Sequence, residues 1–126
     1  MATLTTTTPI AIRPVAQTLP TLNPGERMYA IAFDMDIESL RQAYGDPYNS
    51  AYAEIKKILV THGFKWQQGS VYFGDESITA VTCVLAAMDL ARKLPWFATS
   101  VRDIRMLRIE ELNDLMPAIE QANPRK

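Results

Sequence analysis

Apolar side chains alternate with small or polar ones in the segment MYAIAFDM. Tyr29, Ile31 and Phe33 occupy one phase, and the positions between them, which end in Asp34, occupy the other. A period of two residues is typical of a strand, and large apolar groups in one phase only indicate that one face is covered. We therefore predict a half-buried strand over residues 28–35.

Helical spacing replaces this alternation further along the chain. The segment IESLRQAY predicts a short helix, and GDP separates it from a second helix that is expected to begin at Pro47 with Asp46 as its cap. Residues 78–94 predict a long apolar helix that is capped by Ser77, carries basic residues in its last turn and is ended by Pro95.

The remaining strands complete the order strand, helix, strand, strand, helix, strand. FKWQQGSVYFG predicts a hairpin that turns at QG, residues 101–109 predict the last strand, and EELNDLMPAI predicts a terminal helix. This order is typical of an α+β, ferredoxin-like fold. We expect a four-stranded antiparallel sheet, ordered four, one, three, two, with two helices on one face and a C-terminal helix.

Composition divides the chain into one folded domain and two ends. Residues 1–27 are rich in threonine and proline, carry little charge and show no period, so we predict a disordered tail. The ferredoxin-like domain is expected over residues 28–119, and residues 120–126 are expected to be disordered. At 126 residues with 48% hydrophobic side chains, the chain is long enough for one domain with its own core.

Charge and cysteine usage narrow the classes of function. Cys83 is the only cysteine, which excludes a disulfide framework and a cysteine-based zinc site and favours a cytoplasmic protein. No segment has the length or apolarity of a membrane span, so no membrane partner is expected. The net charge of -1 means that any contact with nucleic acid depends on a local basic patch. His62 is the sole histidine, which excludes a two-histidine ribonuclease mechanism within one subunit.

Three polar residues are predicted to converge at one end of the sheet. In the expected strand order, the end of the first strand meets the starts of the third and fourth, which places Asp34, Ser70 and Asp103 together. The phase of the strands predicts that Asp34 and Ser70 lie on the open face. Each also has a structural interpretation, because Asp34 ends a strand, Ser70 follows a turn glycine, and Asp103 lies between arginines.

The open face is expected to be apolar enough to need a partner. Ala30, Tyr72 and Leu107 are assigned to it, and a homodimer is the simplest way to cover them. Trp66 and Phe73 fall in the covered phase of this reading, which leaves Tyr72 as the aromatic side chain available to stack on a base.

Four runs, MYAIAFDM, YGDPYNSAY, WQQGSVYFG and SVRDIRMLRIE, resemble the virulence-associated protein D (VapD) family, and the resemblance spans about residues 28–119. It implies a bacterial endoribonuclease, often the toxin of a toxin–antitoxin pair, related in fold and dimeric assembly to small nucleases of CRISPR adaptation. It also implies that the catalytic residues are Asp34, Ser70 and Asp103. The family's leucine on the first helix corresponds to Leu40, which is expected to shape the substrate cleft.

The predicted activity is cleavage of RNA phosphodiester bonds, with Arg102 or Arg105 stabilising charge on the phosphate. Two mechanisms stay open: Asp34 could hold a divalent cation, Mg or Mn, with its dimer mate, or act without metal as the base on the ribose 2′-hydroxyl. Expected partners are the RNA substrate, a second copy and an antitoxin protein. The alternative class is a non-catalytic dimeric module that binds a partner protein or small ligand through its open face.

Overall fold

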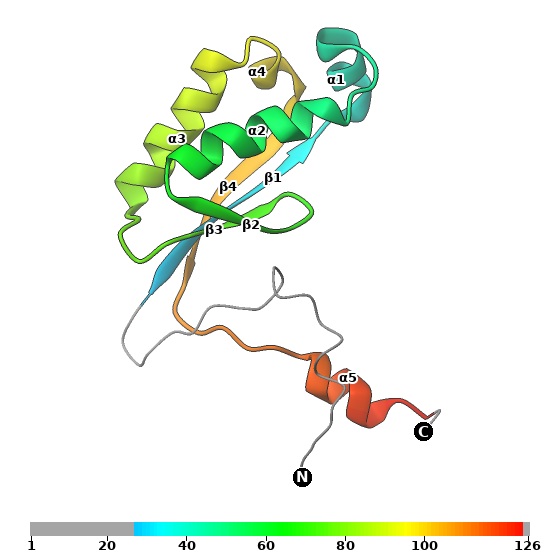
Figure 1. The fold of residues 1–126 in the computed structure, drawn as a ribbon, viewed down its shortest axis with the longest axis vertical. Coiled ribbons are helices and arrows are strands. Elements are labelled where there is room, and N and C mark those ends of the chain that lie inside the picture. Colours follow the sequence, from blue (N-terminus) through cyan, green and yellow to red (C-terminus); the bar gives the residue numbers. More distant parts are fainter. Residues whose placement is uncertain (1–26, 125–126) are drawn as a thin grey trace.

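A computed structural model of the protein describes residues 27–124, so all but the last residue of the tail predicted for residues 1–27 lies outside the described part of the chain. The elements follow the order shown in Figure 1. They are β1 (Met28–Met35), α1 (Ile37–Tyr44), α2 (Ser50–Thr61), β2 (Phe64–Gln68), β3 (Val71–Gly74), α3 (Ala80–Lys93), α4 (Phe97–Ser100), β4 (Val101–Ile109) and α5 (Met116–Ala122).

The four strands form one antiparallel sheet in the order β2-β3-β1-β4. The helices α2 and α3 lie side by side across one face of this sheet, and the other face carries no helix of the domain (Figure 1). The α+β, ferredoxin-like arrangement predicted from the sequence is therefore confirmed. The bounds of β1 and β4 also agree with the prediction.

Both long helices begin later than predicted. Residues 45–49 form a turn in which the Ser50 amide donates to the Pro47 carbonyl at 3.2 Å, and the Asp46 carboxylate lies 3.7 Å from Arg41 instead of capping a helix. At α3 the cap is Thr79, whose side chain and that of Thr82 bond each other's backbone amides in a capping box. Ser77, which was predicted to cap this helix, donates its hydroxyl to the Asp75 carboxylate instead.

The core lies between the sheet and the two long helices. Ile31, Phe33 and Met35 of β1 point toward the helices, as the alternation predicted. Leu59 of α2 and Leu90 of α3 have no exposed surface and meet them. Burial of these large side chains, each contributing about 1.5–3 kcal/mol, determines which face of the sheet the helices cover.

The C-terminal part differs from the prediction in two places. The short α4 between α3 and β4 was not predicted, and its last residue, Ser100, accepts a 2.8 Å hydrogen bond from the Asp36 amide. The terminal helix α5 projects away from the domain (Figure 1) and ends at Ala122, so the prediction of disorder from residue 120 is wrong for residues 120–122. None of the described helices has the length and apolarity needed to span a membrane.

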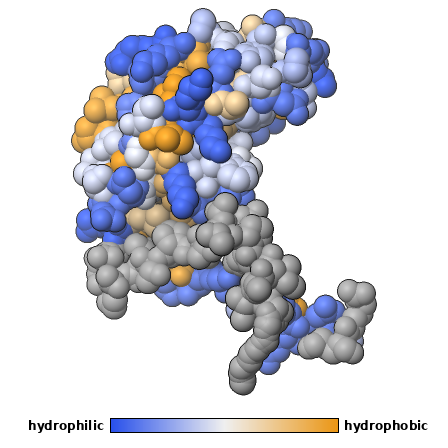
Figure 2. All heavy atoms as spheres, viewed as in Figure 1, coloured by the Kyte–Doolittle hydropathy of each residue, from blue (hydrophilic) through white to orange (hydrophobic). Residues whose placement is uncertain are grey.

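Apolar side chains are exposed along the flank formed by α3 and the edge strand β4. Val81, Val84, Leu85 and Met88 of α3 and Met106 of β4 are each 45% or more exposed. Figure 2 shows hydrophobic surface among hydrophilic residues over α3. Exposed apolar surface of this kind marks places where proteins contact partners.

A partly buried cluster of three polar side chains links the end of α2 to α3. Nε2 of His62, at the end of α2, lies 2.8 Å from Oδ2 of Asp89 in α3, and Nζ of Lys93 lies 3.2 Å from the same oxygen. These contacts hold the pKa of Asp89 below its usual value. The hydrogen bond from His62 has the largest effect, and the hydrogen bond from Lys93 has the next largest. The charged form of Asp89 therefore stabilises the folded state.

We expect this contribution to disappear in acid. Because the pKa of Asp89 is lower in the folded protein, its stabilisation is complete above the unfolded value of about 3.9 and is lost as the pH falls through the folded pKa. Asp89→Asn should lower the free energy of unfolding at pH 7 and reduce its decline below about pH 4. Urea denaturation across this range measures both effects, and an unchanged pH profile in the variant would contradict the assignment.

Candidate active site

The paired aspartates lie on the open face of the two central strands. Asp34 of β1 is directly opposite Asp103 of β4 in the antiparallel register, and Phe33 is opposite Ile104 on the helix-covered face. Residues that are directly opposite point to the same side of a sheet. The predicted placement of Asp34 and Asp103 beside each other on the open face is therefore confirmed.

A bulge next to this pair redirects Arg102. The register steps from Asp34 opposite Asp103 to Met35 opposite Val101, so Arg102 is an extra residue on β4. Bulges of this kind re-aim a side chain and increase the local twist of the strand. The Arg102 guanidinium reaches Asp34 at 3.5 Å and Asp36 at 3.5 Å, and it thereby joins two carboxylates.

Asp36 is grouped with Asp34 and Arg102, although its position in the sequence suggested only a helix cap. Its carboxylate accepts a 2.5 Å hydrogen bond from the hydroxyl of Ser39, a residue of α1. The Ser39 bond is the main reason that the pKa of Asp36 is lowered, and Arg102 adds to it against the opposing effect of desolvation. The D-x-D spacing at the end of the first strand was the available signal.

The second arginine pairs on the same face. Arg105 lies opposite Ala32, in phase with Asp103, and its Nε donates to the Asp103 carboxylate at 2.9 Å. Both side chains are about half exposed or more, so the pair stays accessible to a ligand. The open-face end of β1 and β4 thus presents two carboxylate–guanidinium pairs side by side.

The prediction that Ser70 lies on this face is wrong. Ala32 is opposite Val71, and the Phe33 amide donates to the Ser70 carbonyl at 3.1 Å, which places Ser70 next to Phe33. The Ser70 side chain lines a cavity on the helix-covered side of the sheet. The backbone of Ser70 is therefore next to the end of β1, but its side chain lies on the opposite face of the sheet from Asp103.

The placement of Tyr72 on the open face is also wrong. Tyr72 is opposite Ile31, is 3% exposed and stacks on Phe33 with ring centroids 6.2 Å apart. Burial raises the pKa of its hydroxyl to about 12. Phe73, which was expected in the core, takes the open face opposite Ala30. Because Val71, Tyr72 and Phe73 are all large and apolar, alternation could not decide which of them faces the helices.

Leu40 does not line an accessible cleft. Its side chain has no exposed surface and lies in the hydrophobic core beneath α1. A side chain without exposed surface offers no direct contact to RNA, and the role of Leu40 in shaping the substrate cleft stays a prediction. Leu40 instead packs α1, which carries Ser39 and follows Asp36, against the domain.

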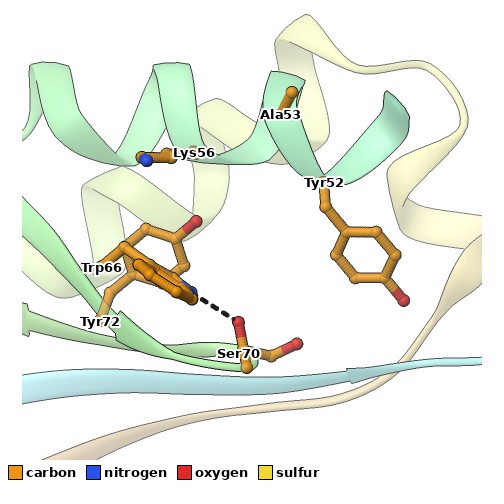
Figure 3. Close-up of a pocket in the computed structure, with 7 residues that line it drawn as sticks. Tyr52, Ala53, Lys56, Trp66, Ser70 and Tyr72 are labelled. Atoms are coloured by element: carbon orange, nitrogen blue, oxygen red, sulfur yellow. Dashed lines mark hydrogen bonds between the residues drawn. The ribbon is translucent and has the colours of Figure 1, made fainter. Parts of the chain in front are cut away.

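A cavity of about 500 Å³ opens between α2 and the β2–β3 turn (Figure 3). Its lining consists of aromatic rings, one lysine and small residues, namely Tyr52, Ala53, Lys56, Trp66, Gly69, Ser70 and Tyr72. In Figure 3, Tyr52 and Trp66 stand on opposite sides of this space, with Ser70 below and α2 above. From the sequence, Lys56 was a candidate only for a basic patch that contacts RNA, and Tyr52 was only one of the apolar positions of a predicted helix.

The residues of one chain do not fit a divalent cation at the end of β1. Among residues 27–124, no group of three acidic, histidine or cysteine side chains is arranged to hold a metal ion. The positive charge of Arg102 lies against the oxygens of Asp34 and Asp36 and opposes a cation there. The prediction that Asp34 holds Mg or Mn therefore gains no support from its surroundings within a single chain.

These features define the class of protein. An antiparallel sheet ordered β2-β3-β1-β4, covered on one face by helices, is a ferredoxin-like α+β domain, and here an acidic pair marks the open face of its two adjoining strands. Residues 27–115 match the family model of the CRISPR-associated protein Cas2. The matched segment covers the whole sheet and both long helices.

Comparison with individual relatives identifies the family more narrowly than the family model does. An endoribonuclease VapD homologue of Helicobacter pylori is 55% identical over 93 residues, which cover 74% of this chain and 97% of the relative. Endoribonuclease VapD 2 of Riemerella anatipestifer is 53% identical over 73% of this chain and 99% of its own length. Endoribonuclease VapD of Dichelobacter nodosus is 45% identical over 75% of this chain and all of its own. The chain belongs to the VapD endoribonuclease family, whose domain is of the Cas2 type, as the four sequence runs predicted.

The buried position of Leu40 leads to a test that separates packing from substrate contact. Leu40→Ala should lower the free energy of unfolding by about 3 kcal/mol because it leaves a cavity in the core. Leu40→Met nearly conserves the volume and should cost less than about 1.5 kcal/mol. Urea denaturation and RNA cleavage are measured on both variants. A Leu40→Met protein as stable as the wild type but inactive would return Leu40 to the substrate site.

Proposed function

We propose that this protein is an endoribonuclease that cleaves RNA at the open-face end of β1 and β4. The observation that carries this proposal is the side-by-side pairing of Asp34 with Asp103 and the attachment of Arg102 and Arg105 to them. Phosphodiester cleavage needs a group that accepts a proton and cations that stabilise charge on the phosphate. Membership of the VapD family supports the same reaction.

In the proposed mechanism, Asp34 accepts the proton of a ribose 2′-hydroxyl. The 2′-oxygen attacks phosphorus, and the bond from phosphorus to the 5′-oxygen breaks. The products are a 2′,3′-cyclic phosphate and a 5′-hydroxyl, which takes its proton from water. The guanidinium groups of Arg102 and Arg105 donate their remaining N–H groups to the phosphate oxygens, where planar, charge-assisted hydrogen bonds are strong.

Asp103 and Ser70 have supporting roles in this proposal. Asp103 orients Arg105 through the 2.9 Å contact and keeps it on the face that carries Asp34. Ser70 contacts the RNA from the other side of the sheet edge, in the cavity under α2. The RNA strand therefore passes around the end of β1 rather than lying flat on the open face.

A homodimer is part of the proposal. Leu107, on the open face opposite Ala30, is 43% exposed, and pairing of two open faces would cover it. The same association would bring two Asp34–Asp103 pairs into one cleft and exclude water from it. Light scattering on the full chain decides the point, because a particle of one 14.2 kDa chain would contradict the dimer.

Asp34→Asn should abolish cleavage without unfolding the protein. The substitution keeps the shape of an exposed side chain and removes its ability to accept a proton, so we expect a loss in kcat of about 100-fold or more. The assay uses a labelled oligoribonucleotide, with and without EDTA, and the end groups of the products are identified. Glu76→Gln is the matched control, since Glu76 is exposed and follows β3 at the opposite end of the sheet.

The mechanism predicts full activity in EDTA and a cyclic phosphate product. Loss of activity in EDTA, with recovery on adding Mg or Mn, would replace the base role of Asp34 by metal binding between two copies. RNA that stays intact with the wild type under every condition would overturn the nuclease proposal. That result would favour the alternative, a dimeric module that binds a partner without cleaving RNA.

We extend the proposal to a toxin that acts on cellular RNA and is restrained by an antitoxin protein. The exposed apolar flank of α3 offers such a protein a surface, because Val81, Val84 and Leu85 have no partner within the described domain that covers them. Induced expression of the wild type in a bacterium should arrest growth, and Asp34→Asn at the same protein level should not. Equal growth of the two strains would contradict the toxin role.

A further inference from the structure

We infer that the cavity between α2 and the β2–β3 turn is the subsite in which RNA places a nucleobase, held between Trp66 and Tyr52 with its phosphate on Lys56. This inference rests on the proposed ribonuclease function and adds a binding site to it. The cavity of about 500 Å³ is within the range of roughly 300–1,000 Å³ that is usual for small-ligand sites.

The aromatic walls suit a flat ring. Tyr52 and Trp66 stand on opposite sides of the cavity in Figure 3, and Tyr72 lines it on the side of Trp66. Trp66 is held in place because its Nε1 donates to the Gly69 carbonyl at 2.9 Å, and Tyr72 is fixed by its stacking on Phe33. Bases stack on preorganised aromatic rings at about 1–3 kcal/mol per base, whatever their sequence.

Lys56 supplies the charge that a nucleotide needs. Its ammonium group lies 5.6 Å from the centre of the Trp66 ring, and no carboxylate among the described residues forms an ion pair with it. A lysine with no anion beside it, on a long flexible stem at the mouth of an aromatic cavity, is free to meet a phosphate. A ligand with only apolar groups would offer this ammonium group no anionic partner.

The cavity is connected to the proposed cleavage site. Tyr52 lines the cavity, and burial is the main cause that raises the pKa of its phenol, with the negative charge of Asp34 among the further causes. Ser70 forms the floor of the cavity and bonds through its carbonyl to the amide of Phe33, the residue before Asp34. A base in the cavity therefore places the adjoining backbone of the RNA at the end of β1.

The first test compares kinetics of charge-reversed variants of the full chain. Lys56→Glu should raise KM for a short labelled oligoribonucleotide about tenfold and leave kcat within about twofold, because the contact is equal in the ground and transition states. Lys57→Glu is the matched control, since Lys57 is the exposed neighbour on the same helix and does not line the cavity. Thermal unfolding shows that both variants fold.

The second test measures binding without cleavage. Asp34→Asn protein is titrated with the same oligoribonucleotide, and quenching of tryptophan fluorescence is recorded. The quench should disappear in Asp34→Asn/Trp66→Phe, in which the buried Trp96 is the remaining tryptophan. Phenylalanine keeps an aromatic ring at position 66, so the domain should remain folded.

The outcomes separate this inference from the proposed function. An unchanged KM in Lys56→Glu, with active wild type, would overturn the subsite and leave the nuclease standing. A fall in kcat alone would also overturn it, because Lys56 would then act on the chemistry. If the wild type cleaves no RNA but the Trp66-dependent quench is present, the nuclease proposal fails and the subsite is supported. Absence of both cleavage and quench would reject both.

Discussion

The antiparallel register between β1 and β4 is the constraint on which the candidate site depends. It sets Asp34 directly opposite Asp103 and, through the bulge that follows, turns Arg102 toward Asp34 and Asp36. A shift of one residue would send these carboxylates to the helix-covered face, where charge without a partner is strongly disfavoured. The large apolar side chains in the opposite phase of β1 hold this register, because only one alignment buries them beneath α2 and α3.

The two faces of the sheet carry different kinds of side chain. Carboxylates and arginines gather on the open face, whereas the helix-covered side holds an aromatic cavity with Lys56 at its mouth. The two faces meet at the end of β1, where the Phe33 amide donates to the Ser70 carbonyl. The negative charge of Asp34 also contributes to the raised pKa of Tyr52. A substrate strand that bends around this end can place a phosphate near the acidic pair while one of its bases occupies the cavity.

Sequence patterns predicted where the strands begin and end better than they predicted which side chains of a strand face the helices. The bounds of β1 were right because large and small residues alternate clearly in this strand, and those of β4 agree as well, although its charged residues do not follow a period of two. The assignment of Tyr72 and Phe73 was reversed because every side chain of β3 except its last glycine is apolar, so either phase buries a large group. Leu40 was placed at a cleft by family resemblance, whereas the packing of α1 buries it completely.

By itself, the sequence determined the order of strands and helices, the ferredoxin-like class and the family, because these follow from local periodicity and from runs of residues in order. It also determined that Asp34 and Asp103 would meet, since antiparallel pairing of two clear strands leaves one good alignment. Only the tertiary structure decided the place of Arg102, Asp36 and Ser70, and the cavity beside Trp66. Their positions depend on a bulge, a turn and a helix packed across the sheet, and each of these arises from contacts between segments that are distant in the chain.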